Sequence, residues 1–197
     1  MNTTLSPVHP GRRRIDDLLL ALKSNRALLA QPDSVFRTCL ANKDALSSFE
    51  RRELFQFLYE DHKLKPGMAI VAEMLLQLPL QENDFYVSRD LIDLAAANGL
   101  GRTVLMEVVS DYRATYEVID YLLYRIDDVD AKDFYGRTAL IQVVSQGVSP
   151  RLDTLRVVKQ LISGHADPTI TDCAGDSAID IARLNENLSI VEFLESL

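Results

Sequence analysis

Apolar positions in the second half of the chain come in paired runs, and a charged turn introduces each pair. The stretch DAKDFYGRTALIQVV (residues 130–144) contains one such turn and the first run of its pair. Gly136 can adopt the positive φ that a tight turn needs at low steric cost. The hydroxyl of Thr138 can cap the first turn of a helix. We therefore predict a turn that leads directly into a helix over the apolar run.

The same pattern occurs two further times. The stretches NGLGRTVLMEVV and DCAGDSAIDIAR place Gly101 and Gly175 where Gly136 stands, at intervals of 35 and 39 residues. A second apolar run follows each copy, with the sequences VIDYLL, VVKQLI and IVEFL. A period of this length with two apolar runs predicts a repeated unit of one turn and two helices.

This unit resembles the ankyrin repeat, which has about 33 residues, a β-turn, two helices and a T-P-L-H-x-A signature. The resemblance implies an all-α fold, an ankyrin-repeat helical solenoid with β-turn fingers. The chain departs from the signature, since Met106, Ile141 and Asp180 stand where the family has its histidine. Ile126 and His165 stand where the family usually has a glycine after the second helix. A β-branched residue is strained at positive φ, so we expect that corner to be rebuilt.

The extra length of the repeats falls between the two helices of a unit, near residues 111–117 and 147–154. The second of these segments contains Gly147, Ser149 and Pro150, which favour loops. Insertions in repeat proteins map to surface loops. We therefore expect regular helix pairs joined by connections of unequal length.

The pattern divides the chain at residue 62. Residues 63–97 are interpreted as a degenerate first repeat, because Gly67 lies 34 residues before Gly101. Further repeats follow over 98–132, 133–171 and 172–197. We expect the last one to cap the stack, since a terminal repeat needs a polar outer face. Its expected outward residues are Asp176, Asp180, Arg183, Glu186, Glu192 and Glu195.

Residues 1–62 form a helical N-terminal extension in this interpretation, either a cap or a small helical domain. Helices are predicted over 15–30, 33–40 and 49–59, and a further one over 68–78. Ser47 and Glu50 have the spacing of a capping box in front of the third helix. Phe49, Leu54 and Leu58 belong to its expected apolar face.

Composition places the chain among ordinary globular proteins. It has 197 residues, of which 47% are hydrophobic and 25% are charged, and its net charge is −8. No apolar run approaches the roughly 18 residues of a membrane span, and the start MNTTLSPVHPGRRR is a poor signal peptide. Cys39 and Cys173 lie far apart in sequence, which favours free thiols and a cytoplasmic or otherwise intracellular location.

The acidic charge is concentrated in the repeats. Residues 63–197 have a balance of −9, whereas residues 1–62 have a balance of +1. This argues against a nucleic-acid ligand and favours a partner protein with a basic or mixed-charge surface. Solubility alone explains the same charge equally well.

Candidate chemistry is sparse. His9, His62 and His165 are dispersed, so no metal-ligand spacing arises. The NGLGRT stretch lacks the lysine and the preceding strand of a phosphate-binding loop, and no Gly-x-Ser-x-Gly elbow occurs. We predict no catalytic activity, no cofactor and no metal.

The ankyrin resemblance implies protein recognition on the concave surface made by the fingers and the first helices. We expect a monomeric interaction module or adaptor, and short irregular ankyrin proteins also resemble host-directed effectors of intracellular bacteria, which are delivered into a host cell. Alternatively, the N-terminal helices are a separate recruiting or catalytic module and the repeats choose the target. Carried over position by position, the expected partner-binding residues are Leu100, Arg102, Asp111, Asp133, Phe134, Tyr135, Arg137, Gln146 and Asp176.

Overall fold

The computed structural model describes residues 17, 20, 24, 30–41, 47–58, 67–77, 94, 97–148 and 150–197. Its regular structure in these residues is helical, apart from isolated β-bridges between Ala97 and Thr103 and between Thr171 and Ser177. The chain divides into two compact units, and the division falls within one helix, between Ile70 and Val71. No helix in the described part of the chain is long and apolar enough to cross a membrane.

The first unit contains α3 (Pro32–Ala41), α4 (Ser48–Gln56) and the start of α5 (Met68–Gln77). These helices confirm the predictions over 33–40, 49–59 and 68–78 as far as their residues are described, whereas most of 15–30 lies outside the described residues. The Ser47 capping box is confirmed, because the Ser47 hydroxyl accepts from Glu50 N and the Glu50 carboxylate accepts from Ser47 N at 2.8 Å. Leu54 and Leu58 are buried as predicted, but Phe49 is exposed.

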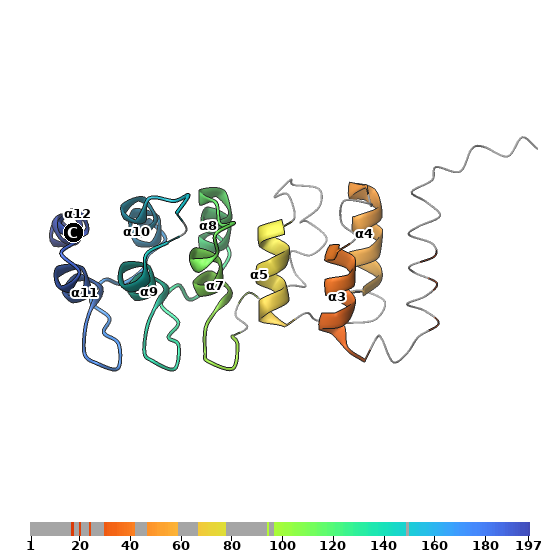
Figure 1. The fold of residues 1–197 in the computed structure, drawn as a ribbon, viewed down its shortest axis with the longest axis horizontal. Coiled ribbons are helices and arrows are strands. Elements are labelled where there is room, and N and C mark those ends of the chain that lie inside the picture. The colour runs from red at the N-terminus through yellow and green to blue at the C-terminus, as the bar shows by residue number, and fades with distance from the viewer. Residues whose placement is uncertain are drawn as a thin grey trace, which may run out of the picture. The chain divides into compact units, whose positions relative to one another are not determined.

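The second unit is a stack of helix pairs. Besides residues Val71–Gln77 of α5, it contains α7 (Val104–Ser110), α8 (Tyr116–Leu123), α9 (Ala139–Gln146), α10 (Thr154–Ser163), α11 (Ala178–Leu184) and α12 (Leu188–Glu195). Figure 1 shows α7, α9 and α11 in one row and α8, α10 and α12 in a second row. Neighbouring helices pack within each row and between the rows. The loops before α7, α9 and α11 extend from the same side of the stack (Figure 1).

Each pair begins with the predicted helix cap. The side chains of Thr103, Thr138 and Ser177 accept a hydrogen bond from the backbone N–H three residues later. This satisfies a donor that the first helical turn leaves without a partner. Positive φ values of 76°, 74° and 89° at Gly101, Gly136 and Gly175 confirm the predicted turns.

Apolar residues at helical spacing fill the space between the two rows. Leu105, Leu140, Ile119 and Leu122 are buried with at most 2% of their surface exposed. The expected long connections are confirmed, since α7 ends at Ser110 and α9 ends at Gln146, well before α8 and α10 begin. The core therefore lies between the rows, and length differences are taken up in loops.

The corners after the second helices differ from one another. His165 has a φ of 71°, so it occupies the left-handed region that glycine prefers. Ile126 is absent from the residues with positive φ in the described part of the chain. Its N–H and that of Arg125 both donate to the Leu122 carbonyl at 2.9 Å. The expected rebuilding at Ile126 is confirmed, and it avoids the strain of a β-branched side chain at positive φ.

The last pair has the polar outer face that the sequence predicted. Asp176, Arg183, Glu186 and Glu192 are exposed, together with the other acidic residues named for this face. Arg183 bridges Asp180 on α11 and Glu195 on α12 at 3.5 Å and 2.7 Å. The outer face of α11 and α12 is therefore charged, and its charges pair with one another.

Candidate functional site

The loops before α7, α9 and α11 share one backbone design, and we refer to residues 98–103, 133–138 and 172–177 as the finger loops. In each loop the N–H of the first residue donates to the carbonyl four residues later. The three distances are 2.9, 3.0 and 3.0 Å. The glycine N–H then donates back to the carbonyl of the first residue in each loop. All three finger loops therefore present their central residues in the same way.

The first residue of each finger loop also stabilises the turn with its side chain. The Oδ1 atoms of Asn98, Asp133 and Asp172 each accept two backbone N–H bonds from their own loop, at distances between 2.8 and 3.2 Å. Sequence reasoning missed this role. The signal was present, because an Asn or Asp stands three residues before the glycine in every copy.

Asp133 therefore has a different place from the one predicted for it. Its side chain has 0% exposed area and is ion-paired with Arg137 at 2.7 Å. Burial raises the pKa of Asp133, but hydrogen bonds from the Arg137 guanidinium and from the N–H groups of Arg137 and Tyr135 outweigh it and hold the pKa below its usual range. We assign Asp133 to the internal structure of the loop, because a partner cannot reach its carboxylate.

The finger loops are joined to one another through their backbones. Phe134 N donates to the Leu100 carbonyl, and Cys173 N donates to the Tyr135 carbonyl, both at 2.9 Å. Glycine permits this approach, since a Cβ atom on Gly101 would lie 2.8 Å from the Phe134 ring. The side chains of adjacent loops are thus held at fixed positions relative to each other.

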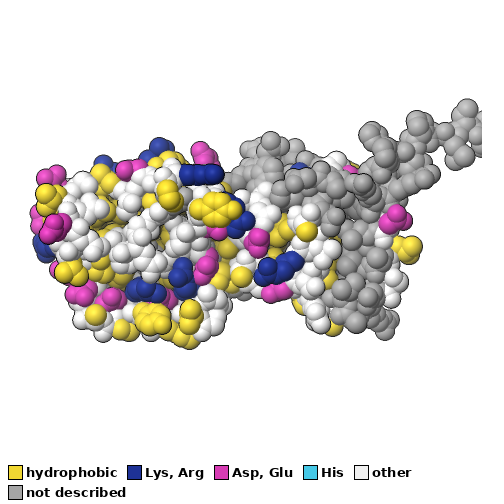
Figure 2. Space-filling model, in the orientation of Figure 1, with side chains coloured by type: hydrophobic (Ala, Val, Ile, Leu, Met, Phe, Trp, Pro, Cys, Tyr) yellow, Lys and Arg dark blue, Asp and Glu magenta, His cyan; other side chains and the backbone are white. Residues whose placement is uncertain are grey.

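Three large apolar side chains project from this row of loops. Leu100, Phe134 and Tyr135 have 51%, 72% and 57% of their surface exposed. The Arg137 guanidinium lies over the Tyr135 ring, 4.9 Å from its centroid. Figure 2 shows hydrophobic and basic side chains side by side over the loops before α7 and α9. Phe134 rests against the neighbouring loop and remains mostly exposed, so it is available for contact.

The other predicted contact residues fall into two groups. Gln146 and Asp176 are exposed. Arg102 and Asp111 are half-buried and ion-paired, Arg102 to Glu107 at 2.8 Å and Asp111 to Arg113 at 2.9 Å. Gln146 and Asp111 lie at the C-terminal ends of α9 and α7, not on the middle of an inner helix face. Among the predicted contact residues, the large exposed apolar side chains therefore all lie on the finger loops.

Sequence reasoning also missed Tyr112, which follows α7 and is 62% exposed. The Arg113 guanidinium lies 5.5 Å from its ring centroid and 3.7 Å from Glu73 on α5. A hydrogen bond from the Arg113 side chain lowers the pKa of Asp111, so the guanidinium beside the Tyr112 ring is also paired with a carboxylate. In the sequence, Tyr112 was recognisable only as part of the inserted segment between two helices, which does not indicate an exposed aromatic residue.

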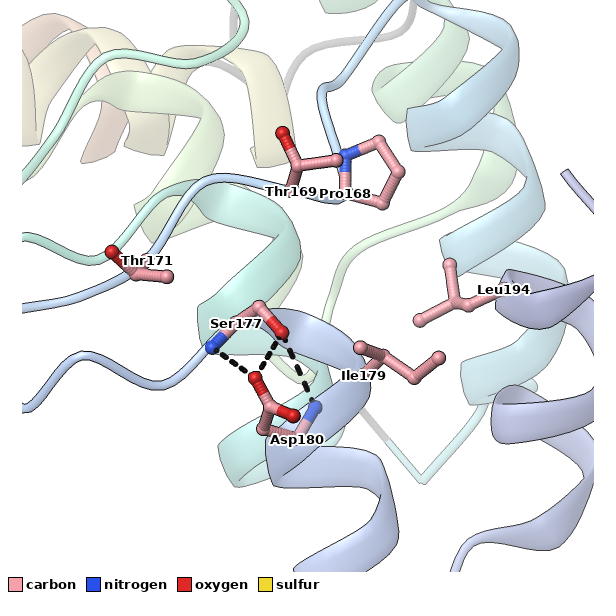
Figure 3. Close-up of a pocket in the computed structure, with 7 residues that line it drawn as sticks. All are labelled: Pro168, Thr169, Thr171, Ser177, Ile179, Asp180 and Leu194. Atoms are coloured by element: carbon pink, nitrogen blue, oxygen red, sulfur yellow. Dashed lines mark hydrogen bonds between the residues drawn. The ribbon is translucent and has the colours of Figure 1, made fainter.

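A pocket opens at the end of the stack, beside the last finger loop (Figure 3). It has a volume of about 430 Å³, and Ile179 from α11 and Leu194 from α12 point into it. At the equivalent positions in the preceding pair, Leu140 and Leu161 are completely buried, and their helices α9 and α10 pack against α11 and α12 of the next pair. The pocket therefore marks where a following helix pair would pack, and we do not assign a ligand to it.

The polar groups Ser177 and Asp180 at this pocket bond to each other and cap the start of α11. Ser177 N donates to the Asp180 carboxylate at 3.1 Å, and the Ser177 hydroxyl also donates to it (Figure 3). These bonds hold the pKa of Asp180 below its usual range. In the part of the chain that the structure describes, no group of His, Cys, Asp and Glu is arranged to hold a metal.

Comparison with known proteins adds no family to these observations. A scan against protein-family models finds no model that matches the chain, and a search of curated proteins finds no match.

Proposed function

We propose that this chain is an ankyrin-type repeat protein that binds a partner protein through its finger loops. The observation that carries the proposal is the row of exposed Leu100, Phe134 and Tyr135 side chains on loops that are hydrogen-bonded to one another. Aromatic residues and arginine are enriched in protein interfaces, and a few such anchors supply most of the binding energy.

The rigidity of the loops supports the same function. A contact residue that is already ordered loses little conformational entropy when its partner binds. The Tyr135 ring is held by Arg137, whose guanidinium is itself fixed by the buried Asp133 carboxylate through bonds of 2.9 and 2.7 Å. The repeated turn, the two helices of each unit and the stacking of the pairs support the ankyrin-type assignment.

The test is the double substitution Phe134→Ala with Tyr135→Ala in the full chain, followed by affinity capture from cell extract. We expect loss of the captured partner, because a hot-spot aromatic contributes at least about 2 kcal/mol, which is roughly 30-fold in affinity. Thermal unfolding should change little, since both residues are exposed.

Two control variants make the result specific. Tyr124→Ala removes a side chain that is 83% exposed and lies at the C-terminal end of α8, in the other row, so capture should be unchanged. Leu140→Ala opens a cavity in the core and should cost about 2–5 kcal/mol of stability. Equal capture by wild type and the double variant would refute the finger-loop assignment. Unfolding of the double variant like Leu140→Ala would show that the two aromatic residues belong to the core.

A further inference from the structure

The finger loops have one backbone but different charges. At equivalent positions after the glycine, the first two loops carry Arg102 and Arg137, and the third carries Asp176. The arginine charges are cancelled locally, since Arg102 pairs with Glu107 at 2.8 Å and Arg137 pairs with Asp133 at 2.7 Å. The first two loops therefore expose apolar side chains, and the charges of their arginines are neutralised by ion pairs.

The third finger loop is acidic and lacks this compensation. Among the described residues, no basic side chain forms an ion pair with Asp172 or Asp176. The nearby Lys132 ammonium instead donates to the Thr171 carbonyl at 2.9 Å. One oxygen of Asp172 is used by the turn, whereas Asp176 is exposed. Figure 2 shows acidic side chains gathered where the loop before α11 lies.

We infer that the partner carries an apolar anchor that faces the first two finger loops and a lysine or arginine that faces the acidic third loop. This inference rests on the proposed binding function. The apolar side chain would lie on Leu100, Phe134 and Tyr135, and the cation would lie opposite Asp176. A compensated arginine cannot attract a charged group as strongly as an uncompensated exposed carboxylate does. Asp176 therefore sets the orientation of the partner along the row of loops.

The stack also fixes the spacing that such a partner needs. The finger loops precede helices of one row, and packed helices lie roughly 8–10 Å apart. In a partner helix with a rise of about 1.5 Å per residue, the spacing nearest this distance that keeps two residues on one face is about seven positions, or two turns. In an extended segment with a rise of about 3.3 Å, it separates residues about three positions apart.

The probe for this inference is a library of random 16-residue peptides (about four and a half helical turns) displayed on phage and selected on the immobilised full chain. The same library is selected on two variants, Phe134→Ala with Tyr135→Ala, and Asp176→Arg. The arginine reproduces the residue that the other two loops carry, so the turn should form. Glu192→Arg is the matched control, because it makes the same charge change at an exposed position of α12.

We expect the peptides enriched on wild type to share an apolar residue and a basic residue at one of these spacings. Fluorescence anisotropy of an enriched peptide should give at least about tenfold weaker binding to Asp176→Arg, and this difference should shrink in high salt. Glu192→Arg should bind within about twofold of wild type, because Glu192 lies on α12, in the row of helices that the finger loops do not precede, and salt screens surface charges beyond about 8–10 Å.

Each other outcome has a definite meaning. Enriched peptides that lack a basic residue, or equal binding to wild type and Asp176→Arg, overturn the inference and leave the finger-loop function standing. Equal weakening by Asp176→Arg and Glu192→Arg also overturns it, because the effect would then be one of net charge. A library with no enrichment over the Phe134→Ala, Tyr135→Ala variant contradicts both the inference and the proposed function.

Discussion

Single glycines determine how closely the finger loops approach each other. Gly101 combines a φ of 76° with the close approach of the Phe134 ring, whereas Gly175 has a φ of 89° and open space around its Cα. Gly99 has open space and no positive φ. Comparison of these three glycines therefore separates the effect of a positive φ from the effect of close contact with a neighbouring loop.

We predict a graded loss of stability when each of these glycines is replaced by alanine. Gly99→Ala should change the free energy of unfolding by no more than about 0.5 kcal/mol. Gly175→Ala should cost about 1–2 kcal/mol, because a Cβ atom is disfavoured at positive φ. Gly101→Ala should cost more than Gly175→Ala, since Phe134 must also move. Urea unfolding measures all three values, and equal losses at Gly101 and Gly175 would contradict the close contact.

At the scale of one element, the finger loops show that Asn and Asp can perform the same structural task. Asn98 and Asp133 accept equivalent pairs of backbone N–H bonds. Asp133 additionally pairs with Arg137, and its pKa is lower than usual in the folded chain. An Asn at position 133 should therefore preserve the turn and remove only the charge interaction.

We predict that Asp133→Asn lowers the free energy of unfolding by about 1.5–3 kcal/mol at neutral pH, the range for hydrogen bonds to charged groups. The folded pKa lies below the unfolded value of about 3.9. The contribution of the charged Asp133 is therefore complete above about pH 4 and is lost as the pH falls through the folded pKa. Urea unfolding of wild type and variant between about pH 7 and pH 3 checks this, and a difference that stays constant with pH would refute it.

Most of the helices were predictable because their signals are local. The caps at Thr103, Thr138 and Ser177, and the Ser47 capping box, need only side chains within three residues of the helix start. The Phe134–Gly101 contact depends on how neighbouring units stack, and no window of sequence shows that stacking. The role of Asp133 is local, because its partners Tyr135 and Arg137 lie in the same loop, and its recurring position before the glycine was overlooked.

At the scale of the whole stack, the last pair replaces apolar packing positions with charges. Asp180, Arg183 and Glu195 stand where the preceding pair has Ile141, Val144 and Ile162. Ile141 and Val144 are buried, and their helix α9 packs against α11 of the next pair. The charged side chains instead pair with one another across the end of the stack.

We predict that the triple substitution Asp180→Ile, Arg183→Val and Glu195→Ile makes the chain self-associate. The change would add three apolar side chains to α11 and α12, which already carry the exposed Leu188 and the pocket residues Ile179 and Leu194. Large exposed apolar patches promote association between protein molecules. Sedimentation velocity over a range of concentrations measures the effect, with Glu192→Ile as the control for a single apolar substitution. A triple variant that sediments like wild type at every concentration would refute this view of the cap.

The three finger loops share one backbone structure, so the residues that form the turn can be distinguished from the residues whose side chains are exposed on it. An Asn or Asp, a glycine and a capping hydroxyl recur in all three loops, while the two residues before each glycine are Gly-Leu, Phe-Tyr and Cys-Ala. The displayed positions can therefore vary without rewriting the fold beneath them. On the proposed binding function, the loops would act as interchangeable cassettes, and a new binding specificity could be installed by exchanging two side chains per loop.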